Sequence, residues 1–166
     1  MQIKDKKKLI VCSFIIVGIF LLDRLTKLYV LNLAETNNTV DIFLTTFLNI
    51  YLVWNKGIAF GLLNFDHGAI YNLITLIITL ISLAILVMII KTKDIRIYFL
   101  SCVFAGAIGN LFDRYYYLAV PDFIDLHINN FHWFVFNVAD IFISFGVICL
   151  ILVELIFDKY LIDENK

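Results

Sequence analysis

Four long apolar segments constrain the fold of this 166-residue chain more than any other feature. They lie at about residues 9–33, 69–90, 97–117 and 136–157. An α-helix of about 20 residues crosses the hydrocarbon core of a bilayer, so each segment is long enough to span it. With 62% hydrophobic residues and a single proline, the composition excludes an ordinary soluble domain. We predict an all-α membrane protein with four transmembrane helices in a single domain, residues 1–166.

The basic residues indicate how these helices are oriented. They are Lys4, Lys6, Lys7 and Lys8 before the first segment, Lys91, Lys93 and Arg96 between the second and third, and Lys159 and Lys166 after the fourth. By the positive-inside rule, this side and both termini are cytoplasmic. The loops at 35–68 and 118–135 contain only one basic residue, Lys56, and are expected outside. The sequence has no cluster of basic residues that would indicate a nucleic-acid partner.

The loop after the first helix contains a strand-like pattern. Leu48, Ile50, Leu52 and Trp54 alternate with Asn49, Tyr51, Val53 and Asn55. A period of two with β-branched and aromatic residues is typical of a half-buried strand, so we predict a small sheet on the outer membrane surface. The following segment, 55–61, has glycines at Gly57 and Gly61, where the backbone could turn or approach a ligand closely.

Polar side chains recur at helical spacing near the outer ends of three predicted helices. They are Asn110, Asp113 and Arg114 in the third, Asn137, Asp140 and Ser144 in the fourth, and Asp23 and Lys27 in the first. Residues three and four apart share one helix face, so each helix offers a polar stripe. We predict that the stripes point at each other, because this shelters them from lipid. Ala105, Gly106 and Gly109 would let the third helix pack closely.

Each charged residue also has a purely structural interpretation. Asp23 and Lys27 can form an i,i+4 ion pair, which fits a structural role as well as substrate contact. Asp113 and Arg114 are adjacent and diverge by about 100° around a helix, so each needs another partner. Arg114 could hold a carbonyl group or a lipid phosphate. Asp140 could be only an acid favoured at a helix N-terminus, but a second carboxylate would then be unexplained.

That second carboxylate is Asp122, in the sequence V-P-D-F-I-D, while Asp140 ends F-N-V-A-D. A charged side chain at membrane depth costs about 2.5 to 3.5 kcal/mol on insertion scales, so such residues usually mark a functional site. Two carboxylates held close together share one proton. The ionised member can take a proton from water while the protonated one donates to a carbonyl oxygen. Asp122 and Asp140 are therefore predicted to hydrolyse an amide as a catalytic pair.

Other chemistries find less support in the sequence. His67, His127 and His132 have no recognised metal-ligand spacing, and no serine lies in a G-x-S-x-G motif. We therefore predict no metal and no cofactor.

The chain resembles the lipoprotein signal peptidase family, also called signal peptidase II. Five motifs carry the resemblance in order: D-x-x-T-K at 23–27, N-x-G-x-A-F-G at 55–61, G-N-x-x-D-R at 109–114, V-x-D-F-I-D at 120–125 and F-N-x-A-D at 136–140. It implies a bacterial inner-membrane aspartic endopeptidase that removes the signal peptide of prolipoproteins before a diacylglyceryl-modified cysteine. It also implies a small extracytoplasmic β-cradle and inhibition by globomycin, a cyclic lipopeptide.

The resemblance also implies roles for single residues. The catalytic pair is Asp122 and Asp140, and the site is shaped by Asp23, Lys27, Asn55, Gly57, Asn110, Asp113, Arg114 and Asn137. Arg24, where a glutamine is common, and Pro121 depart from the family pattern. The expected partners are lipidated prolipoproteins and membrane lipids, and we expect a monomer.

A small transporter or channel is the alternative function. Its polar stripes would line a pathway, which predicts acids and bases through the whole membrane depth. Here they cluster at the outer ends of the predicted helices.

Overall fold

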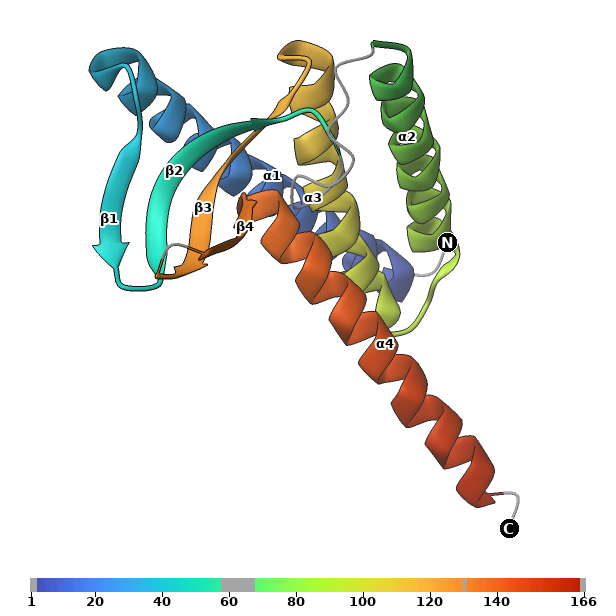
Figure 1. Cartoon of the computed structure of the whole chain (residues 1–166). Coiled ribbons are helices and arrows are strands. Elements are labelled where there is room, and N and C mark those ends of the chain that lie inside the picture. The colour runs from blue at the N-terminus through green and yellow to red at the C-terminus, as the bar shows by residue number, and fades with distance from the viewer. Residues whose placement is uncertain (1–2, 58–67, 130, 165–166) are drawn as a thin grey trace.

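The computed structural model describes residues 3–57, 68–129 and 131–164. These residues form four helices and one four-stranded antiparallel sheet. In chain order the elements are α1 (Ile3–Asn37), β1 (Asp41–Thr45), β2 (Leu48–Asn55), α2 (Gly68–Lys91), α3 (Arg96–Tyr116), β3 (Val120–Ile128), β4 (Phe131–Phe136) and α4 (Val138–Glu164). The sheet lies to one side of the helices, beside the C-terminal half of α1 (Figure 1).

The helices carry apolar side chains on their outer surfaces. In α2 the buried positions include Thr75 and Ser82, whereas Leu73, Leu76 and Leu80 are exposed. Such a distribution is unfavourable in water and is suited to lipid. Among the described residues, three helical segments are long and apolar enough to cross a membrane: Lys6–Asn37, Gly68–Lys91 and Val138–Ile156.

Helix α3 is the central helix of the bundle and packs against α1, α2 and α4 (Figure 1). Its small residues allow this close packing, as predicted. A Cβ atom at Gly106 would overlap the Ala139 carbonyl oxygen of α4, and one at Gly109 would lie 2.8 Å from Asp23 Oδ2 of α1. The polar end of α3 is thereby brought against the polar residues of both neighbours.

The sheet is larger than the single predicted strand. That strand is confirmed as β2, and the sheet order is β1-β2-β3-β4. The second predicted loop, residues 118–135, contains β3 and most of β4, which pair as a hairpin. The first four residues of β3, Val120 to Phe123, are all buried, and an alternation of apolar and polar residues begins only at Ile124. The predicted small sheet is therefore confirmed, although the sequence pattern marked only one of its four strands.

Residues of α1, the sheet and α4 form a shared apolar cluster. Val30 of α1, Val40 before β1 and Phe123 of β3 are buried together, with Ile50 and Val138 packed against them. This cluster fixes the N-terminal turn of α4 against β3.

Candidate active site

Asp122 and Asp140 are placed by the path of the chain through the hairpin. Asp122 is the third residue of β3, and β4 leads through Asn137 directly into α4, whose third residue is Asp140. The two side chains therefore return to the same region. Both residues are buried, with exposed fractions of 2% and 5%.

Three asparagines hold the two carboxylates. Asn55 donates to Asp122 Oδ2 at 2.9 Å, and Asn137 Nδ2 donates to Asp122 Oδ1 at 2.6 Å. Asn110 Nδ2 donates to Asp140 Oδ1 at 2.8 Å. Both carboxylates are thus oriented by amide groups from other elements of the structure.

Asn137 also caps α4. Its Oδ1 accepts from the Asp140 backbone N–H at 3.2 Å, while its own backbone N–H donates to Asp140 Oδ2 at 3.2 Å. This reciprocal arrangement is a capping box. The structural interpretation of Asp140 as a helix N-terminal acid is therefore correct, but its other oxygen is held by Asn110 and is not needed for the cap.

The environment of Asp122 favours its protonated form. Burial, followed by the negative charge of Asp140, raises the pKa of Asp122 to about 7, against the opposing hydrogen bonds from Asn55 and Asn137. Near neutral pH the pair can therefore hold one proton, as a dyad requires.

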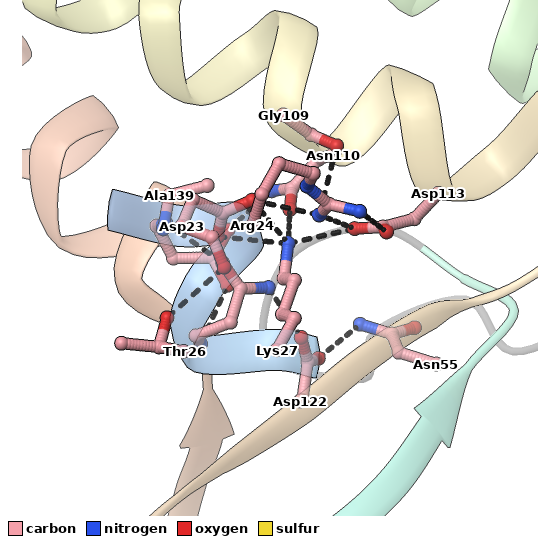
Figure 2. A network of polar contacts seen from close by, with 12 residues as sticks. Asp23, Arg24, Thr26, Lys27, Asn55, Gly109, Asn110, Asp113, Asp122 and Ala139 are labelled. Atoms are coloured by element: carbon pink, nitrogen blue, oxygen red, sulfur yellow. Dashed lines mark hydrogen bonds and ion pairs between the residues drawn. The ribbon is translucent and has the colours of Figure 1, made fainter. Parts of the chain in front are cut away.

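A buried ion network supports the asparagines (Figure 2). The Lys27 ammonium group is fully buried and donates to Asp23 Oδ2 at 3.0 Å, to Asp113 Oδ2 at 2.7 Å and to Asn110 Oδ1 at 2.9 Å. All three of its protons are used. The bond to Asn110 fixes which end of that amide faces Asp140.

Arg24 completes this network, although sequence analysis noted it only as a departure from the family pattern. Its guanidinium group donates to Asp113 Oδ2 at 2.9 Å and to Asp23 Oδ2 at 2.8 Å. It also lies over the Phe112 ring, with Cζ 4.8 Å from the ring centroid. Two cations thus face two carboxylates. Residue spacing could not indicate this, because Asp113 is brought in by another helix.

Arg114 extends the site toward β2. It donates to the Gly57 carbonyl oxygen, and its own carbonyl oxygen accepts from the Tyr71 hydroxyl at 3.0 Å. Of the two alternatives for Arg114, the structure shows a carbonyl group, that of Gly57, and a contact with a lipid phosphate stays a prediction. Its Nε and Nη1 atoms are buried and have no hydrogen-bond partner among the described residues. Tyr71 was not predicted from the sequence.

All ten predicted site residues belong to one hydrogen-bonded network. Gly57 N–H donates to Asn55 Oδ1 at 2.8 Å, which links the Arg114–Gly57 pair to Asp122. The rest of the network runs through the asparagines and Lys27, as described above. The predicted residues 58–61 of the glycine motif lie outside the described residues.

The carboxylates line a pocket of about 260 Å³ between α2, α3 and α4. Its polar part comprises Asn55, Asn110, Arg114, Asp122 and Asp140, and its apolar wall includes Ile78, Ile81, Ile85, Val103, Ala107 and Ile143. A polar reaction site thus adjoins an apolar groove. This combination suits a substrate with a peptide bond next to a hydrocarbon group.

Comparison with known proteins decides the family. A family model described as signal peptidase (SPase) II matches residues 15–157. This chain belongs to the signal peptidase II family. It is 57% identical over 152 residues to the lipoprotein signal peptidase of Pelagibacter ubique (strain HTCC1062), covering 92% of both chains. It is 41% identical over 140 residues to that of Aquifex aeolicus (strain VF5), covering 83% of this chain and 81% of the relative.

Solved structures agree with this assignment. The fold is similar to a bacterial membrane enzyme determined by the in meso method, with a TM-score of 0.70, 30% identity and coverage of 90% of this chain and 89% of the other. A second such enzyme gives a TM-score of 0.66 at 29% identity, covering 87% of this chain and 92% of the other. The resemblance inferred from five motifs is confirmed, and lipoprotein signal peptidase activity is favoured over transport.

Proposed function

We propose that Asp122 and Asp140 are the catalytic pair of this bacterial membrane peptidase. The observation that carries the proposal is the geometry of the pair: two buried carboxylates from different elements, oriented by three asparagines, line one pocket. The other proposed site residues act through this pair. Asn55, Asn110 and Asn137 orient it, while Asp23, Lys27, Asp113, Gly57 and Arg114 shape the surrounding network.

The reaction follows from one shared proton. We assign this proton to Asp122, whose pKa is raised to about 7. Water attacks the scissile carbonyl carbon, its proton passes to Asp140, and Asp122 donates to the carbonyl oxygen. When the C–N bond breaks, Asp140 returns its proton to the leaving nitrogen and the diol returns one to Asp122. The products are a carboxylic acid and an amine, and no covalent enzyme intermediate is needed.

We further propose that the substrate is a prolipoprotein with a diacylglyceryl-modified cysteine. The apolar wall of the pocket, which includes Ile81 and Ala107, supports this because it adjoins the dyad. Each buried methylene contributes about 0.8 kcal/mol, so the lipid can hold the scissile bond in place. Inhibitors of the globomycin type, which carry a lipid chain, would occupy the same pocket.

Initial rates for two peptides test this substrate assignment. One peptide carries the lipidated cysteine, and the other has the same sequence with an unmodified cysteine. We expect the lipidated form to be cleaved far faster in the same detergent. Equal rates would show that the lipid is not recognised.

The pocket can be tested separately from the substrate. Ala107→Phe fills the apolar wall and should raise KM for the lipidated peptide. Leu73→Phe is the matched control, because Leu73 is an exposed position of α2 outside the pocket. A similar effect of both variants would refute the proposed lipid position.

For the membrane arrangement, we propose four transmembrane helices with α3 as the fourth, in the bacterial inner membrane. Helix α3 is packed among three apolar helices, which supports its placement at the same depth. The distribution of basic residues supports a cytoplasmic position for both termini and an outer position for the sheet. The single domain 1–166 is proposed to act as a monomer. Reporter fusions after Thr39 and after Leu118 should report an extracytoplasmic position, and cytoplasmic signals would refute this topology.

A further inference from the structure

A second cluster of ionisable side chains lies on the sheet. Asp125 and His127 are two residues apart on β3, and His132 of β4 is the cross-strand partner of His127. Ligand atoms of the three side chains lie within 4.8 Å of one another. No recognised ligand spacing marks this group in the sequence, because its members come from two strands that pair across a register shift.

The cluster faces away from the catalytic dyad. Successive side chains of a strand point to opposite faces, so Asp122, three residues before Asp125, lies on the other face. A separate pocket contains Asp125, His127 and His132 together with Asn49 and Asp41. None of these five residues lines the dyad pocket.

Several polar atoms of the cluster have no hydrogen bond within the part of the chain that the structure describes. Asp125 is fully buried and His127 is 7% exposed, yet Asp125 Oδ1 and His127 Nδ1 have no hydrogen-bond partner among the described residues. The same is true of Oδ1 of Asn49, which is paired with Asp125 across the strands. Buried polar atoms rarely lack a partner in folded proteins, so a water molecule or an ion is expected at these atoms.

An ion pair between Asp125 and a protonated His132 is the simplest alternative. His132 Nδ1 lies 2.7 Å from Asp125 Oδ2, so such a pair explains that oxygen. It leaves Asp125 Oδ1 and His127 Nδ1 without a hydrogen-bond partner among the described residues, although His127 Nδ1 lies 3.7 Å from Asp125 Oδ2. A cation near these atoms would satisfy the carboxylate and both imidazole groups together.

We propose that Asp125, His127 and His132 bind a first-row divalent transition metal ion, for which Zn²⁺ is the natural probe. Two imidazoles and one carboxylate form a donor set that Zn²⁺ binds, leaving a fourth position for water or Asn49 Oδ1. Tetrahedral coordination needs ligand atoms about 3.3 Å apart, so small side-chain movements suffice. The ion would join β3 to β4 and brace the strand that carries Asp122. It has no part in the dyad chemistry.

Direct metal binding tests this site. The full-length protein, purified with a tag that contains no histidine and stripped with chelator, is titrated with Zn²⁺, and bound metal is counted after dialysis. We expect one ion per chain. Co²⁺ in place of Zn²⁺ should give the visible absorption of a four-coordinate site.

Histidine variants make the test specific. His132 is about half exposed, so His132→Ala should fold normally and weaken Zn²⁺ binding at least about tenfold. His67→Ala removes the remaining histidine of the sequence and should leave the affinity unchanged. His127→Ala combined with His132→Ala should abolish stoichiometric binding.

Three outcomes would overturn the proposal: no stoichiometric Zn²⁺ in the wild-type protein, unchanged affinity in His132→Ala, or loss of binding in His67→Ala. Cleavage of the lipidated peptide by the same His132→Ala preparation shows that it is folded. Because the readout is bound metal, a negative result leaves the assignment of Asp122 and Asp140 intact.

Discussion

Replacing Asp122 by asparagine is a strict test of the dyad. The two carboxylate oxygens accept from Asn55 and Asn137, so an amide at this position would place an NH₂ group against one of these donors. Asn55 cannot turn its amide over without losing the bond from Gly57. Asn137 cannot do so without losing the bond from Asp140. The substitution therefore keeps the shape of the side chain while creating one donor conflict.

The expected effects on stability and on rate differ in size. A buried donor without an acceptor costs about 1–3 kcal/mol, which is less than the usual 5–15 kcal/mol stability of a folded protein. Asp122→Asn should therefore fold. Loss of a general acid reduces the rate by about 10²- to 10⁴-fold, equivalent to about 2.7–5.4 kcal/mol of activation free energy. The rate should thus fall by two orders of magnitude or more in a protein that is only modestly destabilised.

The assay compares cleavage of a lipidated prolipoprotein peptide with thermal unfolding of the same samples. Asp140→Asn should behave like Asp122→Asn. Asp41→Asn is the matched control, because this aspartate is exposed on β1 and should change neither measurement. Near-wild-type turnover in either dyad variant would refute the assignment. So would a loss of activity no larger than the fraction unfolded.

Three further predictions concern the surroundings of the dyad. Because the raised pKa of Asp122 lets the pair keep its proton up to about pH 7, the pH profile of kcat should fall as pH rises through that value, and a flat profile to pH 9 would contradict the shared proton. Lys27→Met leaves two buried carboxylates with one cation fewer and frees the amide of Asn110, so about 3–5 kcal/mol of stability should be lost in chemical denaturation, together with activity. Gly106→Ala should lower both the unfolding temperature and the rate because its Cβ meets the α4 backbone, whereas Gly18→Ala, with open space around its Cβ, should be neutral.

The helices could be predicted because bilayer thickness imposes a length on apolar segments. Their ends could not: the first was predicted at 9–33 and is found at Ile3–Asn37. Hydropathy detects the apolar part, whereas the helix continues through polar residues until Asn38, whose φ of 62° ends it. The grouping of the polar stripes was also predictable. Polar side chains are unfavourable in contact with lipid, so they are expected between the helices.

The start of β3, which carries Asp122, could not be predicted from periodicity. Asp122 was expected in a loop, and it lies in a strand that contains Pro121. Proline is tolerated near the start of a strand, but its presence argues against a strand when only the sequence is read. The pairing of Pro121 with Trp54 depends on β2, which is far away in the chain. Tertiary contacts, not local propensity, decide this part of the fold.

Arg24 illustrates the same dependence for charge. Asp23 and Arg24 are neighbours on α1, and adjacent helical side chains diverge, so sequence alone does not join them. Asp113 of α3 lies where both Arg24 and Lys27 can reach it, at 2.5 Å and 2.7 Å. The two cations then balance Asp23 and Asp113, so the network carries little net charge toward the dyad. With a neutral side chain at position 24, Lys27 alone would face both carboxylates, and the network would carry one net negative charge beside the dyad. Arg24 therefore keeps the buried network next to the dyad close to electrically neutral.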